Sequence, residues 1–228
     1  MIKVFLIVLS FSFSALGASE ILLVVADDFN SSKAKLSAYE AGKKVFGSVD
    51  VNLGKNGLGW GIGFKELRHK SDEPIKKEGD KKAPAGIFHL GTAFGYQKNF
   101  ELNIPYLYAD EKLLCVDDSE SKYYNRFVNF SKGINSFEHM KREDEQYKYG
   151  LLVKHNPGQK KQRGSCIFLH IEKEPNHPTA GCTSMKEKDL LKILHWLDKE
   201  KHPILIQVPK AYLKEVYKLY PELINHPL

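Results

Sequence analysis

The sequence has few cysteines and, after its first eighteen residues, no apolar run long enough to cross a membrane. Its 228 residues include only three cysteines, so at most one disulfide can form within the chain and at least one thiol stays free. Cys115, Cys166 and Cys182 allow three pairings, and unpaired buried thiols at positions 115 and 166 are the alternative. A reactive Cys182 requires that any disulfide join Cys115 to Cys166.

The sequence also lacks internal repeats, a low-complexity linker and a basic helix. The net charge of +6 is scattered along the chain, which is a poor basis for binding nucleic acid. At the amino terminus, "MIKVFLIVLSFSFSALGA" has one basic residue before a short apolar run and small residues at its end. This pattern predicts a signal peptide over residues 1–18, with an uncleaved anchor as the alternative. We expect a protein of the periplasm or cell envelope, with residues 19–228 forming one domain that includes the carboxyl-terminal helices.

Most of the chain has the pattern of strands separated by turns, because its apolar stretches are short, rich in Val, Ile, Phe and Tyr, and bounded by Gly, Asn, Asp or Pro. We therefore predict a mainly β (α+β) fold, a β-sandwich or partly closed barrel with a few peripheral helices. Ser184 and Glu187 have the spacing of a capping box, which predicts a helix from about Met185. Further helices are expected at 210–220 and 136–144. Strands are expected at 21–25, 48–53, 86–94, 113–118, 149–156, 165–171 and 203–208, with a hairpin turn at 41–43.

Cys182 lies in "TAGCTSM", twelve residues after His170, which ends the apolar run "CIFLH". A thiol becomes a nucleophile when a histidine, a cation or a helix start favours its thiolate. The predicted helix start and His170 could both act in this way, and Gly181 would let the backbone N–H groups form an oxyanion hole. The alternatives are a small buried cysteine and a histidine that merely closes a core strand.

Several segments together resemble one family. "HIEKEPNHPTAGCTSM" is similar to the signature of the L,D-transpeptidase (YkuD-type) catalytic domain, in which a histidine is followed after a loop by Ser/Thr-x-Gly-Cys. "KKEGDKKAPAGIFHLG" is similar to the family's Pro-x-Gly-x-Phe segment, and "NLGKNGLGWG", "CVDDSESKYYNRFV" and "GSCIFLHI" follow in the expected order. The resemblance spans roughly residues 21 to 209 and points to a divergent branch of the family.

The resemblance assigns roles to particular positions. It implies that Cys182 is the catalytic nucleophile, His170 its general base, Thr179 the Ser/Thr of the motif and Gly181 the glycine beside the nucleophile. The group that orients the imidazole is often a main-chain carbonyl in this family. The chain departs from the pattern at Ala180, where many members have His, at Ser184, where many have Arg, and at Ile171, where the family has Gly.

The implied reaction is acyl transfer on peptidoglycan. Cys182 would attack the amide between the third residue of a tetrapeptide stem and its terminal D-alanine, and the acyl group would pass to an amine of another stem. With water as the acceptor, the protein would be an L,D-carboxypeptidase. A non-catalytic peptidoglycan-binding domain is the third alternative. The resemblance calls for no cofactor and no metal, and we expect a monomer with no membrane span after signal cleavage.

Other residues are weaker candidates. The turn "DDSESKYYNR" is predicted to bring Tyr123, Tyr124 and Asn125 near the substrate, with Thr179 and Ser184 as further contacts. Arg163 could bind a stem carboxylate, although a solvated surface arginine is the common case. His155, His177 and His195 are not expected to be catalytic. A zinc site of Cys166, His170, His177 and Cys182 matches no common structural spacing, and "GKNGLGWGIGF" lacks the Gly-Lys-Ser/Thr of a phosphate loop.

Overall fold

A closed β-barrel is the centre of the protein. The computed structural model describes residues 20–224, so the expected signal peptide at 1–18 lies outside the described residues. Eight strands follow one another around the barrel, and β10 pairs with both β11 and β5, which closes the ring. Six of the neighbouring pairs are antiparallel, and β1–β13 and β11–β12 are parallel. In ring order the strands are β10 (Tyr149–Val153), β11 (Phe168–Ile171), β12 (Thr183–Met185), β3 (Lys43–Asn52), β2 (Lys33–Glu40), β1 (Glu20–Ala26), β13 (Ile204–Pro209) and β5 (Ala83–Gly95).

The barrel confirms the mainly β prediction, and closure removes the free edges that an open sheet would expose. Strands β1 and β13 are buried along their whole length, which explains their nearly unbroken apolar sequence. The β2–β3 hairpin confirms the predicted turn, because Ala41 and Gly42 both have positive φ angles of 46° and 79°, the geometry of a tight two-residue hairpin loop. Two short strands extend the sheet beside β5: β4 (Leu58–Trp60) and β6 (Tyr106–Tyr108).

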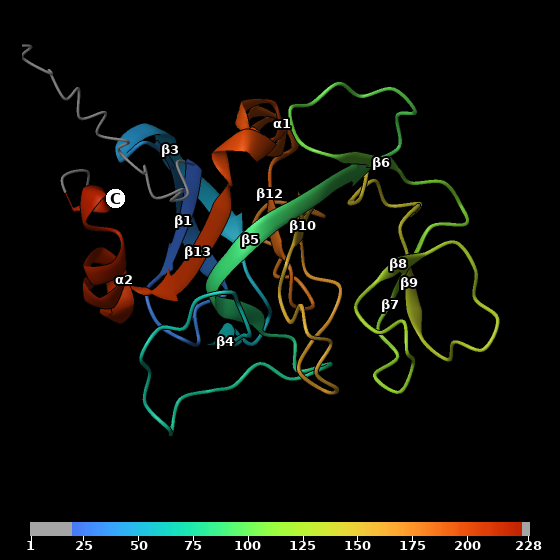
Figure 1. Cartoon of the computed structure of the whole chain (residues 1–228), viewed down its shortest axis with the longest axis horizontal. Helices are drawn as coiled ribbons and strands as arrows, with labels where there is room; N and C mark the ends of the chain where they lie inside the picture. The colour runs from blue at the N-terminus through green and yellow to red at the C-terminus, as the bar shows by residue number, and fades with distance from the viewer. Residues whose placement is uncertain (1–19, 225–228) are drawn as a thin grey trace, which may run out of the picture.

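Two short helices lie outside the barrel (Figure 1). Helix α1 (Glu187–Trp196) packs on β10 and β11, and α2 (Leu213–Leu219), with the turn before it, confirms the helix expected at 210–220. The predicted start at Met185 and the Ser184 cap are wrong, because Thr183–Met185 pairs as β12 and Lys186 precedes the helix without a side-chain cap. No helix within residues 20–224 is long and apolar enough to cross a bilayer. The 3₁₀ helices are η1 (Lys199–Lys201), η2 (Lys210–Tyr212) and η3 (Pro221–Leu223).

A small lobe, residues 109–147, stands beside the barrel (Figure 1). It contains a three-stranded sheet of β7 (Leu114–Val116), β8 (Phe127–Val128) and β9 (Phe137–His139) in the order β8-β7-β9. The helix predicted at 136–144 is wrong, because β9 pairs with β7 and a helix of so few residues gains little by itself. Between lobe and barrel lies a second apolar core, separate from the barrel core, that includes Phe94, Phe168 and Cys182.

Candidate active site

A fixed turn holds Cys182 immediately before β12. The Thr179 hydroxyl donates to the Cys182 carbonyl at 2.6 Å and accepts the Gly181 N–H at 3.1 Å. Gly181 has a φ of +150°, and a Cβ there would lie 3.1 Å from the Lys82 carbonyl oxygen. Any other residue would therefore strain the turn. Thr179 lines the cavity, but its hydroxyl is used to shape the turn that presents Cys182.

The Cys182 thiol is buried and protonated at rest. The residue is 8% exposed, and its Sγ accepts the Phe168 N–H at 3.3 Å and donates to the Cys166 carbonyl at 3.5 Å. Burial, with the nearby Glu138 carboxyl, raises the pKa of Cys182 to about 12. The predicted help from a helix start is wrong, since α1 begins at Glu187, beyond β12. Any activation must therefore come from a base acting on the neutral thiol.

His170 has the tautomer that a base requires. It lies on β11, 4% exposed, and its Nδ1 is 2.7 Å from the Ile171 carbonyl oxygen. A carbonyl only accepts hydrogen bonds, so Nδ1 carries the proton and Nε2 keeps its lone pair. Burial lowers the pKa of His170 to about 4, which keeps the imidazole neutral at physiological pH. This carbonyl is a main-chain partner of the kind that the resemblance implied.

Cys182 and His170 line one cavity of about 360 Å³ at the junction of barrel and lobe. His170 lies on β11 and Cys182 immediately precedes β12, the adjacent parallel strand, in which Thr183 is paired with Leu169 and Ser184 with His170. The rest of the wall carries charged side chains of both signs. The cationic residues are Lys76, Arg142 and Lys173, and the carboxylates are Glu78, Asp117 and Glu138.

Comparison with known families identifies the family of the chain. The L,D-transpeptidase catalytic domain model (YkuD) matches residues 25–206, a range that includes both His170 and Cys182. The chain belongs to this family. Searches of curated proteins and of solved structures each gave no match. The YkuD assignment confirms the resemblance, and the closed barrel is consistent with it.

In this YkuD domain, two of the three cavity carboxylates are held by buried donors. Glu78 accepts hydrogen bonds from the Tyr124 hydroxyl and from Ser165 Oγ, the latter at 2.7 Å. Glu138 accepts one from the Tyr147 hydroxyl at 2.7 Å, and burial raises the pKa of Glu138 to about 7. Glu138 therefore exchanges a proton near neutral pH, next to the thiol whose pKa it raises.

Two of the three cavity cations, Lys76 and Arg142, come from segments far from the Gly-Cys motif. Lys76 is 3% exposed, and its ammonium donates to the Asp80 carboxylate at 2.6 Å and to the Lys77 carbonyl at 2.9 Å. Arg142 comes from the lobe, pairs with Asp144 through Nε and Nη2 at 2.8 and 2.6 Å, and lies over the Tyr147 ring. Arg142 supplies a guanidinium to a YkuD site that has Ser184 where many members have Arg. The sequence around Lys76 and Arg142 did not predict that either residue lines the cavity.

Five predicted substrate contacts do not line the Cys182 cavity, so the structure does not place them beside the thiol. Ser184 is buried in β12, and within residues 20–224 its hydroxyl has no partner. Tyr123 packs on Phe130. Tyr124 is buried, and its hydroxyl donates a hydrogen bond to Glu78. It therefore positions a residue that lines the cavity without lining the cavity itself. The remaining two are Asn125, whose side chain bonds the backbone of residues 155, 156 and 166, and Arg163, which lines a different cavity.

A disulfide joins Cys115 of β7 to Cys166, just before β11, and leaves Cys182 free. This is the pairing that a reactive Cys182 requires. The predicted strand 165–171 begins only at Phe168, because Cys166 has a φ of +53°. The disulfide also removes the Cys166 thiolate from the alternative zinc site, and no group of three potential ligands in residues 20–224 is placed to hold a metal.

We expect the disulfide to stabilise the fold strongly. It links cysteines 51 residues apart, and closing a loop of that length is worth about 4 kcal/mol in the chain-entropy account. The double variant Cys115→Ala/Cys166→Ala should therefore lose about 4 kcal/mol of unfolding free energy in a urea titration. It should also lose activity, because the lobe carries Arg142 and Glu138 to the site. Cys182→Ala is the matched control that keeps the disulfide, and equal midpoints for the double variant and the wild type would contradict the prediction.

Proposed function

We propose that the protein is a cysteine-dependent peptidoglycan L,D-transpeptidase that acts on stem tetrapeptides through a thioester on Cys182. The observation that carries the proposal is the shared cavity of Cys182 and His170, with its walls of both charges. The scissile bond of such a stem follows a diamino acid, which carries an ammonium and a carboxylate on its side chain. Glu78, Asp117 and Glu138 suit the ammonium, and Arg142 and Lys173 suit the carboxylate.

Acylation starts from a neutral pair. The Cys182 thiol turns from the Cys166 carbonyl into the cavity, and its proton passes to His170 Nε2 as sulfur attacks the stem carbonyl. The oxyanion forms beside the Gly181–Cys182 turn, where the backbone N–H of Cys182 and the Lys76 ammonium favour negative charge. His170 then gives the proton to the nitrogen of the departing D-alanine, and a thioester remains on Cys182.

Deacylation reverses the roles. An amine of a second stem attacks the thioester, His170 takes its proton, and Cys182 leaves as a thiolate that recovers the proton from His170. The product is a cross-linked dimer. If water attacks instead, the product is a tripeptide, and the protein is an L,D-carboxypeptidase.

Product analysis tests the proposal. Purified protein is incubated with the disaccharide tetrapeptide, and the products are separated by chromatography and weighed by mass spectrometry. We expect free D-alanine together with a dimer one D-alanine lighter than two monomers. Tripeptide and D-alanine without dimer would support the carboxypeptidase. No D-alanine, together with retention on insoluble peptidoglycan, would support the non-catalytic binding domain and contradict the proposal.

A further inference from the structure

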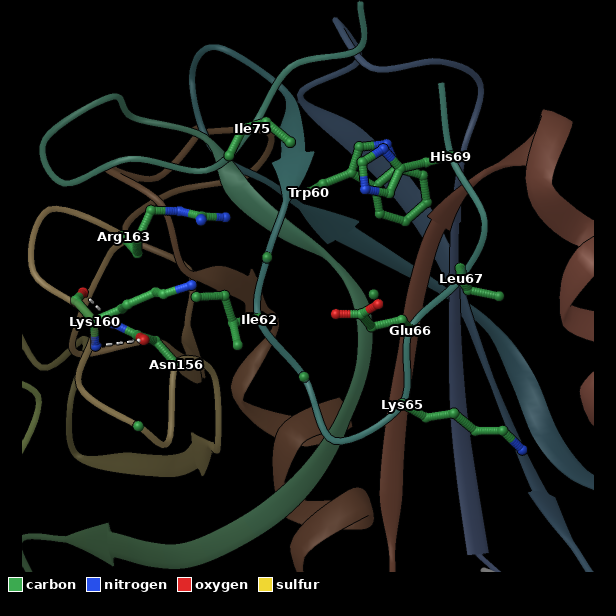
Figure 2. Close-up of a pocket in the computed structure, with 14 residues that line it drawn as sticks. Trp60, Ile62, Lys65, Glu66, Leu67, His69, Ile75, Asn156, Lys160 and Arg163 are labelled. Atoms are coloured by element: carbon green, nitrogen blue, oxygen red, sulfur yellow. Dashed lines mark hydrogen bonds between the residues drawn. The ribbon is translucent and has the colours of Figure 1, made fainter. Parts of the chain in front are cut away.

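A second cavity, of about 530 Å³, is lined by 14 residues (Figure 2). Its walls come from the segment after β4, from Ile75 and from the loop between β10 and β11. Residues close in sequence line the two cavities: Ile75 and Arg163 line the second cavity, whereas Lys76 and Ser165 line the Cys182 cavity. The proposed reaction uses no residue of the second cavity.

The walls of the second cavity are held by buried hydrogen bonds. His155 accepts the Ile62 N–H on Nδ1 at 3.2 Å and donates from Nε2 to the Arg163 carbonyl at 2.9 Å, so it joins two walls. Asn156, fully buried, bonds the backbone N–H and carbonyl of Lys160, both at 2.9 Å. Burial lowers the pKa of His155 to about 4, which keeps this histidine neutral. The positive charge of the cavity therefore belongs to its lysine and arginine side chains.

Two cations and one carboxylate face each other across the second cavity. In Figure 2 the ends of Arg163 and Lys160 point inward from one wall, and Glu66 points inward from the other. Arg163 is positioned by its Nε, which donates to the Lys76 carbonyl at 3.2 Å. Within residues 20–224, no carboxylate forms an ion pair with Arg163 or Lys160. Lys65 points away from the cavity and lies over the Tyr220 ring at 5.1 Å.

We propose that this second cavity binds a carboxylate of a peptidoglycan stem peptide through Arg163 and Lys160. The inference rests on the proposed function, since the stem concerned lies next to the one held at Cys182. Two adjacent unpaired cations on a fixed loop suit a carboxylate. The facing Glu66 disfavours a polyanion such as a phosphate polymer, and it suits a peptide that also carries an ammonium group.

The experiment measures binding without turnover. In Cys182→Ala protein, the two tryptophans of the chain give separate indole N–H signals by NMR. Trp60 lines the second cavity, whereas Trp196 packs on Phe46, away from it. We expect soluble disaccharide tetrapeptide to move the Trp60 signal saturably and leave that of Trp196 in place. The concentration for half-maximal shift should rise at least tenfold in Arg163→Gln/Lys160→Gln.

Two controls make the result specific. Lys161→Gln removes a neighbouring charge that pairs with Glu120 and does not line the cavity, so it should bind like the parent. Tetrapeptide with amidated carboxyls should bind at least fivefold more weakly. The proposal is overturned if Trp60 does not move, if the double variant binds like the parent, or if acetate at equal carboxylate concentration has the same effect. Because the protein used in this experiment lacks Cys182, the Trp60 signal reports binding alone. Failure of the transpeptidase proposal would therefore appear in the product analysis and not in this measurement.

Discussion

Cys182→Ala should release no D-alanine from the disaccharide tetrapeptide and form no cross-linked dimer. The substitution removes the only thiol that the disulfide leaves free. Neither water nor another side chain of the cavity can take its place as the covalent nucleophile that His170 deprotonates. We expect the rate to fall by about 10⁴-fold or more, to the background without enzyme. Product chromatography at long incubation times gives the measurement.

The fold of this variant must be checked, because Cys182 belongs to the second core. Loss of one buried sulfur should cost about 1 kcal/mol, within the usual range for a small core truncation, so thermal melting should shift by only a few degrees. A complementary measurement is intact mass after a thiol-reactive carbapenem, in which the wild type should gain a single adduct on Cys182. Activity that survives in folded Cys182→Ala would remove this residue from the mechanism.

His170→Gln should lower kcat/KM by about 10²- to 10⁴-fold, the usual contribution of a general base. Glutamine keeps a polar side chain of similar reach but cannot accept the thiol proton. The dependence of wild-type activity on pH should also report the role of His170. Because burial lowers the pKa of His170 to about 4, the neutral base persists as pH falls, and activity should decline near pH 4 to 5 rather than near the ordinary histidine value of about 6.5.

The pKa of the Cys182 thiol determines how its reactivity changes at basic pH. The pKa of Cys182 is raised to about 12, so alkylation by iodoacetamide should be much slower than that of an ordinary cysteine from pH 7 to 9, and its rate should not level off above the ordinary cysteine pKa of about 8.5. His195→Gln, an exposed position on α1, is the matched control for His170→Gln. Wild-type kcat at saturating substrate that halves near pH 6.5, or His170→Gln that keeps full activity, would contradict the assigned role of His170.

The fold was predictable from sequence to the extent that its elements are locally marked. The short Val-, Ile- and Phe-rich runs predicted barrel strands but missed β12, and Ala41-Gly42 predicted the hairpin, because two positive φ angles favour few residues. The two helix errors share one cause. At 136–144 and at Thr183–Met185, pairing with β7 and with β11 overrides a helical pattern, and no local signal reports a partner that lies far along the chain.

The sequence by itself determined the family and predicted a nucleophile and a base, because His170 and Gly181-Cys182 lie in one segment with the family's own spacing. Only the tertiary structure decided what surrounds them. Lys76, Glu78 and Arg142 come from segments that meet only when the barrel closes and the Cys115–Cys166 disulfide holds the lobe against it. Burial, likewise, is a property of the assembled fold. It raises the pKa of Cys182 and lowers that of His170, so the sequence predicted an activated thiolate where the structure has a neutral pair.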